Sequence, residues 1–363
     1  MNRTDSSLPS HISLVDLARH LDLSVGTVSR ALNGHSKVRN ATRQRVLLAA
    51  REIGYVPNPL ARGLSSGKSG LVGVLFSHFN NLISGVFLIR LLKLLEAHGK
   101  RALIKVANPI TEESHDIIRH FTLMRVEGVL VIGPSLEQCH QTLEPLAGRQ
   151  IPFSLLNLGG PASLHLSVQY DRSLVNEKLV LHLMEQGHQR LALIGFDPKA
   201  FSFQARLEGI ARAYKARRLD ADRYVDQYSL PREKQETTFA YGSRMAARLL
   251  ECGSLATACI AANDELALGA IQRFHAAGIR VPDEMSVAGF DNLSFSSYAT
   301  PGITSIDLDV DRALELTFNM LIRQMEDPDG PPPASVTLEP TLILRESTGP
   351  ARRTKGLRER RDG

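Results

Sequence analysis

The sequence of 363 residues has little cysteine and no tryptophan, and aromatic residues make up only 6% of it. Its three cysteines, Cys139, Cys252 and Cys259, form no CxxC pair and leave an odd thiol. Disulfide scaffolds and zinc sites need grouped cysteines, so this usage argues against both and is typical of a reducing cytoplasm. We therefore expect no disulfide framework and no metal site.

Catalytic and nucleotide-binding signatures are also missing. The sequence has no GxSxG, no GxxxxGK[ST], no GxGxxG after a predicted strand and no HExxH. His98, His182 and His188 lie on or just after predicted helices, without the spacing of metal ligands. The pattern predicts neither an enzyme nor a bound cofactor.

No apolar run is long enough to cross a bilayer. The run that begins at Leu71 is interrupted by polar and charged residues from His78 onward, and the first eleven residues lack the apolar core of a signal peptide. These absences predict a cytoplasmic protein without a membrane segment.

Charge divides the chain into three parts. Residues 1–70 carry ten Lys/Arg against four Asp/Glu, net +6, and residues 351–363 carry net +4. The whole chain is +5, which leaves a net −5 for residues 71–350. Basic charge at the ends suits a nucleic-acid-binding head on a body that does not touch DNA, and residues 349–363 are predicted to be a disordered basic tail.

The amino-terminal part is predicted to begin with two short helices. An apolar stripe recurs at helical spacing over Leu14, Leu17, Ala18 and Leu21. Ser13 can cap this helix with Asp16 three residues on, and Ser24 can cap the next one. In the second helix Val28 and Ala31 point inward. Its outer face carries small side chains that let a helix enter the major groove, with Val25, Gly26, Thr27 and Arg30 outside.

A third helix closes a small core. Val46, Ala50 and Ile53 repeat at i, i+4 and i+7, Asn40 is the expected cap, and Gly54 and Pro57 end the helix. Residues 1–57 are therefore predicted to form an all-α helix-turn-helix domain.

These residues resemble a known family. LDLSVGTVSRALNG, followed by VRNATRQRVLLAAREIGYVPNPLARGL, resembles the DNA-binding head of the lactose-repressor (LacI/GalR) family. The resemblance implies base contacts by Val25, Gly26, Arg30 and Leu64. It also implies phosphate contacts by Ser13, Ser24, Thr27, Ser29, Asn33, Thr42, Tyr55 and Asn58. One departure is Asp22, which replaces the usual turn glycine and is among the few residues that tolerate a left-handed backbone.

Residues 58–70 are predicted to be a hinge helix and a linker. Asn58 can cap the helix, Pro59 suits its first position, and Leu60, Ala61 and Leu64 form one apolar edge. A helix shorter than about 12 residues is marginal in water, and Gly63 weakens this one further. We therefore expect it to order only on DNA, paired with its copy from a second subunit. Paired apolar wedges that kink the duplex require a dimer.

From Leu71 the chain alternates between apolar runs of strand length and segments of helical period. Runs of strand length occupy 71–76, 102–107, 128–133, 151–157, 166–171, 191–196, 224–230, 257–263 and 286–291. Helices are predicted near 83–98, 112–124, 136–147, 203–217 and 236–251, with two more that end near Gln186 and Ala277. This order is typical of an α/β body with two doubly wound, mostly parallel sheets.

The body resembles a type I periplasmic-binding-protein fold, which the LacI family uses to sense small molecules. Residues 71–348 are predicted to bind an effector and to dimerise. The N-lobe is expected at about 71–168 and 304–330, and the C-lobe at about 169–303 and 331–348.

Ligands of open α/β sheets lie outside the carboxyl ends of the strands. The polar residues predicted at such positions are Asn157, Arg206, Asn263, Asp264 and Asp291. ARLEG, AANDELALGA and SVAGFD match family segments whose Arg, Asn and Asp hold the effector, and Asn157 matches more loosely. Structural alternatives remain open: Asp264 as a helix cap, Asp291 as a turn former and Arg206 as a surface residue.

The sequence thus predicts a repressor that binds a pseudo-palindromic double-stranded DNA operator as a homodimer, under the control of a small-molecule effector. The basic tail has no leucine heptad that would make a tetramer. A sugar or sugar derivative is the preferred effector. The alternatives are a nucleoside- or purine-responsive, corepressed regulator and a solute-binding module without DNA function. Two departures leave specificity open: Asn81-Leu82-Ile83-Ser84 replaces the usual Asn-Pro-Phe-Phe, and Thr237 replaces an aromatic that often stacks on the ligand.

Overall fold

The protein is described by a computed structural model and divides into two compact units, Met1–Ser69 and Gly70–Gly363. The residues described are 12–33, 37–55, 69–77, 79, 81–107, 113–134, 143, 146, 148, 150–159, 165–197 and 201–352. The predicted hinge helix with Asn58 and Leu64, and most of the helix expected at 136–147, lie outside these residues.

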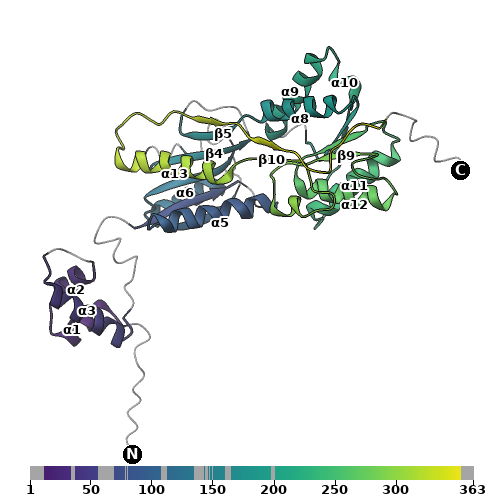
Figure 1. The fold of residues 1–363 in the computed structure, drawn as a ribbon. Coiled ribbons are helices and arrows are strands. Elements are labelled where there is room, and N and C mark those ends of the chain that lie inside the picture. Colours follow the sequence, from purple (N-terminus) through teal and green to yellow (C-terminus); the bar gives the residue numbers. More distant parts are fainter. Residues whose placement is uncertain are drawn as a thin grey trace, which may run out of the picture. The chain divides into compact units, whose positions relative to one another are not determined.

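The first unit is the predicted three-helix head (Figure 1). Its helices are α1 (Leu14–Leu21), α2 (Val25–Leu32) and α3 (Asn40–Glu52). They enclose a core formed by Leu17, Ala18, Leu21, Val28, Ala31, Val46, Ala49 and Ala50. The apolar stripes read from the sequence therefore meet in one cluster.

The helix ends follow the predicted capping with one exception. Ser13 and Asp16 form a capping box at α1, and the Ser24 side chain accepts a hydrogen bond from the Thr27 amide at α2. Asp22 ends α1 in the left-handed conformation, at φ 53°. The prediction that Asn40 caps α3 is wrong, because the N-cap is Arg39, which makes no side-chain capping bond, and Asn40 is already helical.

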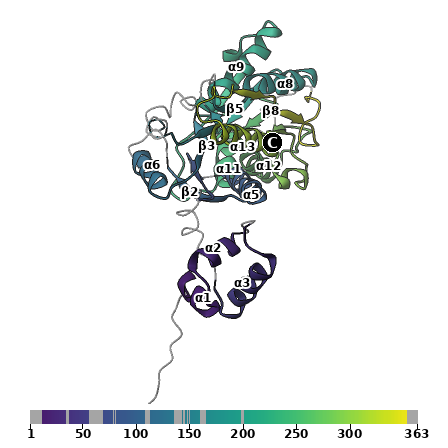
Figure 2. The ribbon, with the colours of Figure 1, turned by 90° about the vertical axis from the view of Figure 1, so that its left-hand side faces the viewer.

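The second unit has two lobes, each built on its own parallel sheet (Figures 1 and 2). The six-stranded sheet has the order β11 (Val336–Leu338), β5 (Ser167–Tyr170), β4 (Phe153–Gly159), β3 (Gly128–Pro134), β1 (Leu71–Phe76) and β2 (Arg101–Val106). The helices of this first lobe within the described residues are α5 (Leu82–Ala97), α6 (Glu113–Leu123) and α13 (Val310–Glu326).

Strand β1 shows why this sheet is covered on both faces. Val72, Val74 and Phe76 lie in the cluster that contains the α5 side chains, whereas Leu71 and Leu75 lie in the cluster that contains Ile118 and Phe121 of α6. Alternate residues of a strand point to opposite faces, so a strand buried on both sides is apolar throughout. The apolar run LVGVLF is therefore the signature of a central parallel strand.

The second lobe holds a four-stranded parallel sheet of order β7 (Val225–Tyr228), β6 (Leu191–Ile194), β8 (Ala258–Ala261) and β9 (Ser286–Ala288). Helix α8 (Arg172–Glu185) packs against α9 (Phe201–Ala216), and α11 (Thr238–Glu251) packs against α12 (Asp264–Ala276), on opposite faces of the sheet (Figures 1 and 2). Two short helices, α10 (Ala221–Tyr224) and η1 (Ser294–Ser297), complete this lobe.

The chain crosses between the lobes more than once, and the crossings differ from the expected bounds. The expected division near residue 168 falls inside β5, which pairs in the first sheet. Residues 331–348 were expected in the second lobe, but β11 pairs with β5 in the first. Local patterns do not show these pairings because the partners are distant in sequence. A separate two-stranded antiparallel sheet joins β10 (Ser305–Asp307) to β12 (Thr341–Ile343).

The predicted fold class, a helix-turn-helix head with a two-lobed, mostly parallel α/β body, is confirmed. None of the described helices combines the length and the apolar character that a membrane span requires.

Candidate functional sites

Helix α2 presents the small outer face that was predicted for reading bases. Val25, Gly26 and Arg30 are exposed. The Arg30 Nε donates a 3.0 Å hydrogen bond to the Gly26 carbonyl oxygen, so its guanidinium lies back along the helix. A side chain at position 26 would contact this guanidinium, since a Cβ built there lies 3.7 Å from Arg30 Nη2. The glycine therefore keeps the face small, as a helix that enters the major groove requires.

The described residues expected to hold phosphates are distributed over all three helices of the head and their ends. Ser24 Oγ lies 2.8 Å from Thr27 Oγ1, and Asn33 Nδ2 donates a 3.5 Å hydrogen bond to Ser29 Oγ. Ser13, Ser24 and Asn33 are exposed, and Thr27, Ser29, Thr42 and Tyr55 are half-buried. Helix N-termini and exposed hydroxyls are common phosphate ligands in DNA complexes.

One supporting residue of the head was missed by the sequence analysis. Arg45 Nη2, on α3, donates a 2.8 Å hydrogen bond to the carbonyl oxygen of Leu21, at the end of α1. This bond satisfies a terminal helix carbonyl and fixes the turn that leads into α2. A basic residue on the third helix reads simply as a charged surface residue, which is why the pattern did not identify it.

In the body, the polar residues expected at strand ends surround one region where the lobes meet. Asn157 lies near the end of β4 and is 3% exposed, and α9, which carries Arg206, contacts β4. Arg206 is 6% exposed. Its Nη1 donates a 2.8 Å hydrogen bond to the Ala262 carbonyl oxygen, and its Cζ lies 3.6 Å from the centroid of the Phe290 ring. Arg206 is therefore a buried residue and not the surface arginine that was the alternative.

Asn263 and Asp264 have definite structural duties. The Asn263 side chain caps α12 by accepting a hydrogen bond from the Leu266 amide. Asp264 is fully buried, and its carboxylate accepts hydrogen bonds from the Ser305 hydroxyl, the Ser296 hydroxyl and the Leu293 amide. Asp264 is thus the centre of a network that ties α12 to the chain after β9, and it does not cap its helix.

Asp291 differs from its neighbour. Its backbone lies at φ 100°, in the left-handed region that favours glycine, and such strain is frequent at functional sites. Burial raises the pKa of its carboxyl, as does the nearby Asp264, whereas Arg206 and Arg172 oppose the rise. The Asp291 carboxyl therefore lies close enough to both arginines for their charges to act on it.

Two further residues of this region were missed. Arg172, the first residue of α8, is 6% exposed, with its Cζ 5.5 Å from the Tyr170 ring centroid and 5.3 Å from that of Phe290. Glu265 is also buried, and its carboxylate accepts a hydrogen bond from the Leu82 amide. The signal for Arg172 was its position directly after a strand end; the signal for Glu265 was weaker, because an acidic residue in a first helical turn is commonplace.

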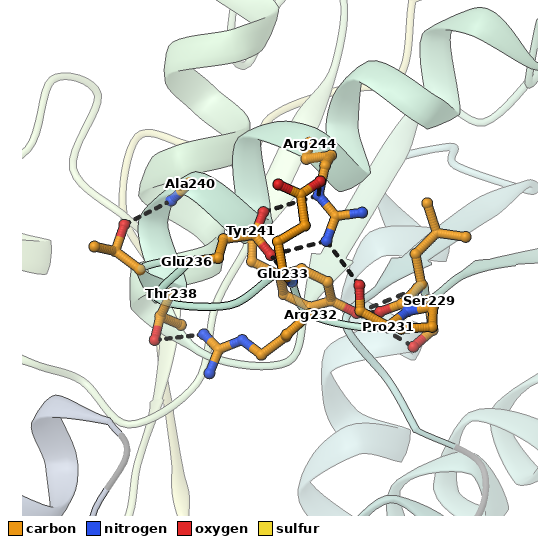
Figure 3. A network of polar contacts seen from close by, with 11 residues as sticks. Ser229, Pro231, Arg232, Glu233, Glu236, Thr238, Ala240, Tyr241 and Arg244 are labelled. Atoms are coloured by element: carbon orange, nitrogen blue, oxygen red, sulfur yellow. Dashed lines mark hydrogen bonds and ion pairs between the residues drawn. The ribbon is translucent and has the colours of Figure 1, made fainter.

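The loop after β7 is held by its own contacts (Figure 3). The guanidinium groups of Arg232 and Arg244 each lie 5.3 Å from the Tyr241 ring centroid, and Arg244 pairs with Glu236. Thr237, which replaces the expected aromatic, caps α11. The nearby Phe239 is half-buried, with its ring centroid 5.8 Å from that of Phe295.

The described residues include no group of three or more His, Cys, Asp or Glu side chains that could hold a metal ion. The chemistry of the body site is therefore that of guanidinium, carboxylate, amide and aromatic groups, which suits a polar organic ligand.

Comparisons with known proteins match both units. Residues 13–58 match a family described as bacterial regulatory proteins, lacI family, and residues 180–348 match the periplasmic binding protein-like domain. The HTH-type transcriptional regulator AscG of Escherichia coli K12 is 27% identical over 339 residues, which cover 92% of this chain and 98% of AscG.

Solved structures agree on the fold. The lac repressor dimer bound to operator and an anti-inducer aligns with a TM-score of 0.81 at 22% identity, over 93% of this chain and 99% of that one. A transcriptional regulator CelR–cellobiose complex aligns with a TM-score of 0.63 at 24% identity, over 93% of this chain and 100% of that one. These likenesses concern the type I periplasmic-binding-protein-like body and the helix-turn-helix head alike. The head thus matches the lacI family of bacterial regulatory proteins, the body matches the periplasmic binding protein-like domain, and the transcriptional regulator AscG is similar to the chain over almost its whole length.

Proposed function

We propose that this protein is a homodimeric repressor that binds a pseudo-palindromic operator and whose DNA affinity is set by a sugar or sugar derivative held between its lobes. The observation that carries the proposal is the pairing of two features in one chain. An exposed, small-faced helix α2 stands in one unit, and in the body of the other unit the buried Arg206 lies near enough to the half-buried Asp291 for their charges to interact.

The head supplies DNA binding. Val25, Gly26 and Arg30 read base edges, and the hydroxyl residues around α1 and α2 hold phosphates. Two heads related by a two-fold axis read two half-sites, so the operator is a pseudo-palindrome. The lac repressor, whose solved structure is a dimer on operator, supports this arrangement by analogy.

The body supplies control. A sugar offers several hydroxyl groups, which a carboxylate and a guanidinium can bind with paired hydrogen bonds. The structure of CelR with cellobiose supports a sugar by analogy. Effector binding changes the angle between the lobes, and through it the affinity of the protein for its operator.

In this proposal the chain acts as a binding protein and has no catalytic role. As a regulator of operator DNA it works in the cytoplasm, at the nucleoid. A nucleoside or purine effector, and a body without any effector, are the competing cases.

The test is DNA binding by the full-length protein, measured by fluorescence anisotropy on a selected operator with and without a panel of sugars and nucleosides. The effector should change the affinity by about 5- to 150-fold, the range typical of allosteric coupling. An Arg206→Ala variant should bind DNA normally and lose the response. Unchanged affinity in every solute would contradict effector control, and absence of any preferred DNA sequence would contradict the repressor itself.

A further inference from the structure

We propose that the effector carries a carboxylate or a phosphate group in addition to its hydroxyls, and that Arg172 is the residue that selects this anion. The inference rests on the proposed effector site and specifies the ligand class that the site takes.

The position of Arg172 places a second buried cation beside the first. Arg172 begins α8 directly after β5, at a crossing from the first lobe to the second. Its guanidinium and that of Arg206 both lie over the Phe290 ring, at 5.3 Å and 3.6 Å from the centroid. Two guanidinium groups that share one aromatic ring repel each other, so a further anion beside them would stabilise the arrangement.

The hydrogen-bonding groups of these arginines are largely unused. Among the described residues, the Arg172 side chain makes aromatic contacts but no hydrogen bond or ion pair. Arg206 uses Nη1 on the Ala262 carbonyl, and its buried Nε has no partner in the described structure. A buried guanidinium without hydrogen-bond partners lowers the stability of the folded state, and such a group is expected where a bound ligand supplies the missing acceptors.

Two neutral groups near Arg172 also lack hydrogen-bond partners among the described residues. The Tyr170 hydroxyl and the Ser173 hydroxyl are buried without a hydrogen-bond partner among the described residues. Tyr170 stacks near the Arg172 guanidinium, and Ser173 follows Arg172 in α8. The unused donors and acceptors are thus concentrated around Arg172.

The acids of this region leave the donors of Arg172 unused. The carboxyl group whose charge acts on both arginines is Asp291, and none of the ion pairs among the described residues includes either guanidinium. The carboxylate of Asp264 accepts hydrogen bonds from two hydroxyls and an amide, and that of Glu265 from the Leu82 amide. The planar donors of Arg172 match a carboxylate or phosphate on the effector, which forms stronger hydrogen bonds to a guanidinium than a neutral hydroxyl does.

The experiment uses isothermal titration calorimetry on the full-length protein with matched pairs of probes. The pairs are D-glucuronate and D-glucose, D-galacturonate and D-galactose, and D-glucose 6-phosphate and D-glucose. At least one anion should bind at least 10-fold more tightly than its neutral partner. The acid and phosphate arms show which anion the site takes.

Variants then assign the preference to Arg172. Arg172→Gln should reduce the preference for the anion to about threefold or less, and Arg172→Lys should retain part of it, because the charge remains. The control is Arg212→Gln, which removes an exposed arginine of α9 that pairs with Glu177 and should leave the preference unchanged. The melting temperature of ligand-free Arg172→Gln should stay equal or rise, since an unpaired buried charge is removed.

The outcomes separate this inference from the proposed function. Neutral sugars that bind as tightly as their anions would overturn the inference and leave effector control standing. An anion preference that survives in Arg172→Gln would also overturn the inference. If the melting temperature of that variant falls as well, the role of Arg172 is structural. If none of the probes binds, the inference fails, and the DNA assay on the wider panel still decides the proposed function.

Discussion

The carboxylate of Glu265 accepts a 2.9 Å hydrogen bond from the backbone amide of Leu82. Glu265 lies in the first turn of α12 in the second lobe, and Leu82 is the first residue of α5 in the first lobe. A negative charge at a helix N-terminus is stabilised by the terminal amides and by the helix dipole. This contact therefore joins the two lobes directly, and any change in their relative angle has to preserve or break it.

Removal of this contact should loosen the lobes. Glu265→Ala removes a part-buried hydrogen bond between a charged carboxylate and the Leu82 amide, which should cost about 1 to 3 kcal/mol in the free energy of unfolding of the body. Urea denaturation measures this loss, and Glu251→Ala, at an exposed position that ends α11, is the control, with an expected change below about 0.5 kcal/mol. Effector affinity should shift with Glu265→Ala only, and equal effects of both variants would contradict a role for this contact.

Asp264 should make the stability of the body depend on pH. Burial raises the pKa of its carboxyl from 3.8 to about 6, although hydrogen bonds from Ser305, Ser296 and the Leu293 amide oppose the rise. The folded state holds this proton more tightly than the unfolded state, so the proton adds to the free energy of unfolding. This contribution is fully present below about pH 4, is lost as the pH rises through about 6, and amounts to at most about 3 kcal/mol.

The measurement compares wild type with Asp264→Asn by urea denaturation at several pH values between 4 and 7. The difference in unfolding free energy between the two proteins should change in that window and be constant above it. A difference that does not vary with pH would contradict the raised pKa.

Replacement of Asp22, in the turn after α1, by glycine should stabilise the head. Asp22 is held at φ 53° and ψ 45°, a conformation that costs an L-residue energy and glycine none. Asp22→Gly should stabilise the head by up to about 1 kcal/mol, and Asp22→Ala should destabilise it. Hydrogen exchange of head peptides in the full-length protein reports both changes, and greater protection in the alanine variant than in the glycine variant would contradict the assignment.

Arg30 and Thr42 should differ in their effects on DNA binding. Arg30→Ala removes a side chain assigned to base readout, so it should cost about 1 to 3 kcal/mol on the preferred operator and relax the choice of one base pair. Thr42→Ala, at a position assigned to phosphate, should weaken binding to all sequences alike. Affinities measured over a set of single-base operator variants distinguish the two patterns, and the same profile for both variants would contradict these roles.

Local physics made much of the head predictable. Capping by Ser13 and Ser24, the inward Val28 and the left-handed Asp22 each depend on residues within a few positions of one another. The capping prediction that failed, at Asn40, concerned a helix whose first turn has no side-chain cap at all.

The body was predictable in its elements and less so in its long-range pairings. Asp264 is bound by hydroxyls that are 32 and 41 residues away in the sequence. Strand β11 pairs with β5, with Val336 opposite Val168. The spacing of apolar residues in a sequence indicates local secondary structure, but it does not show which distant strand or side chain becomes the partner. The role of Arg172 emerged only when the structure placed it beside Arg206 over one aromatic ring.

The central claim is that the chain reads DNA as a symmetric pair. It is tested most directly by selection of bound duplexes from a random library with the purified full-length protein, followed by sequencing. The account predicts enrichment of a pseudo-palindrome whose two half-sites are related by a two-fold axis. Enrichment of no sequence, or of a single asymmetric half-site bound by a monomer, would contradict it.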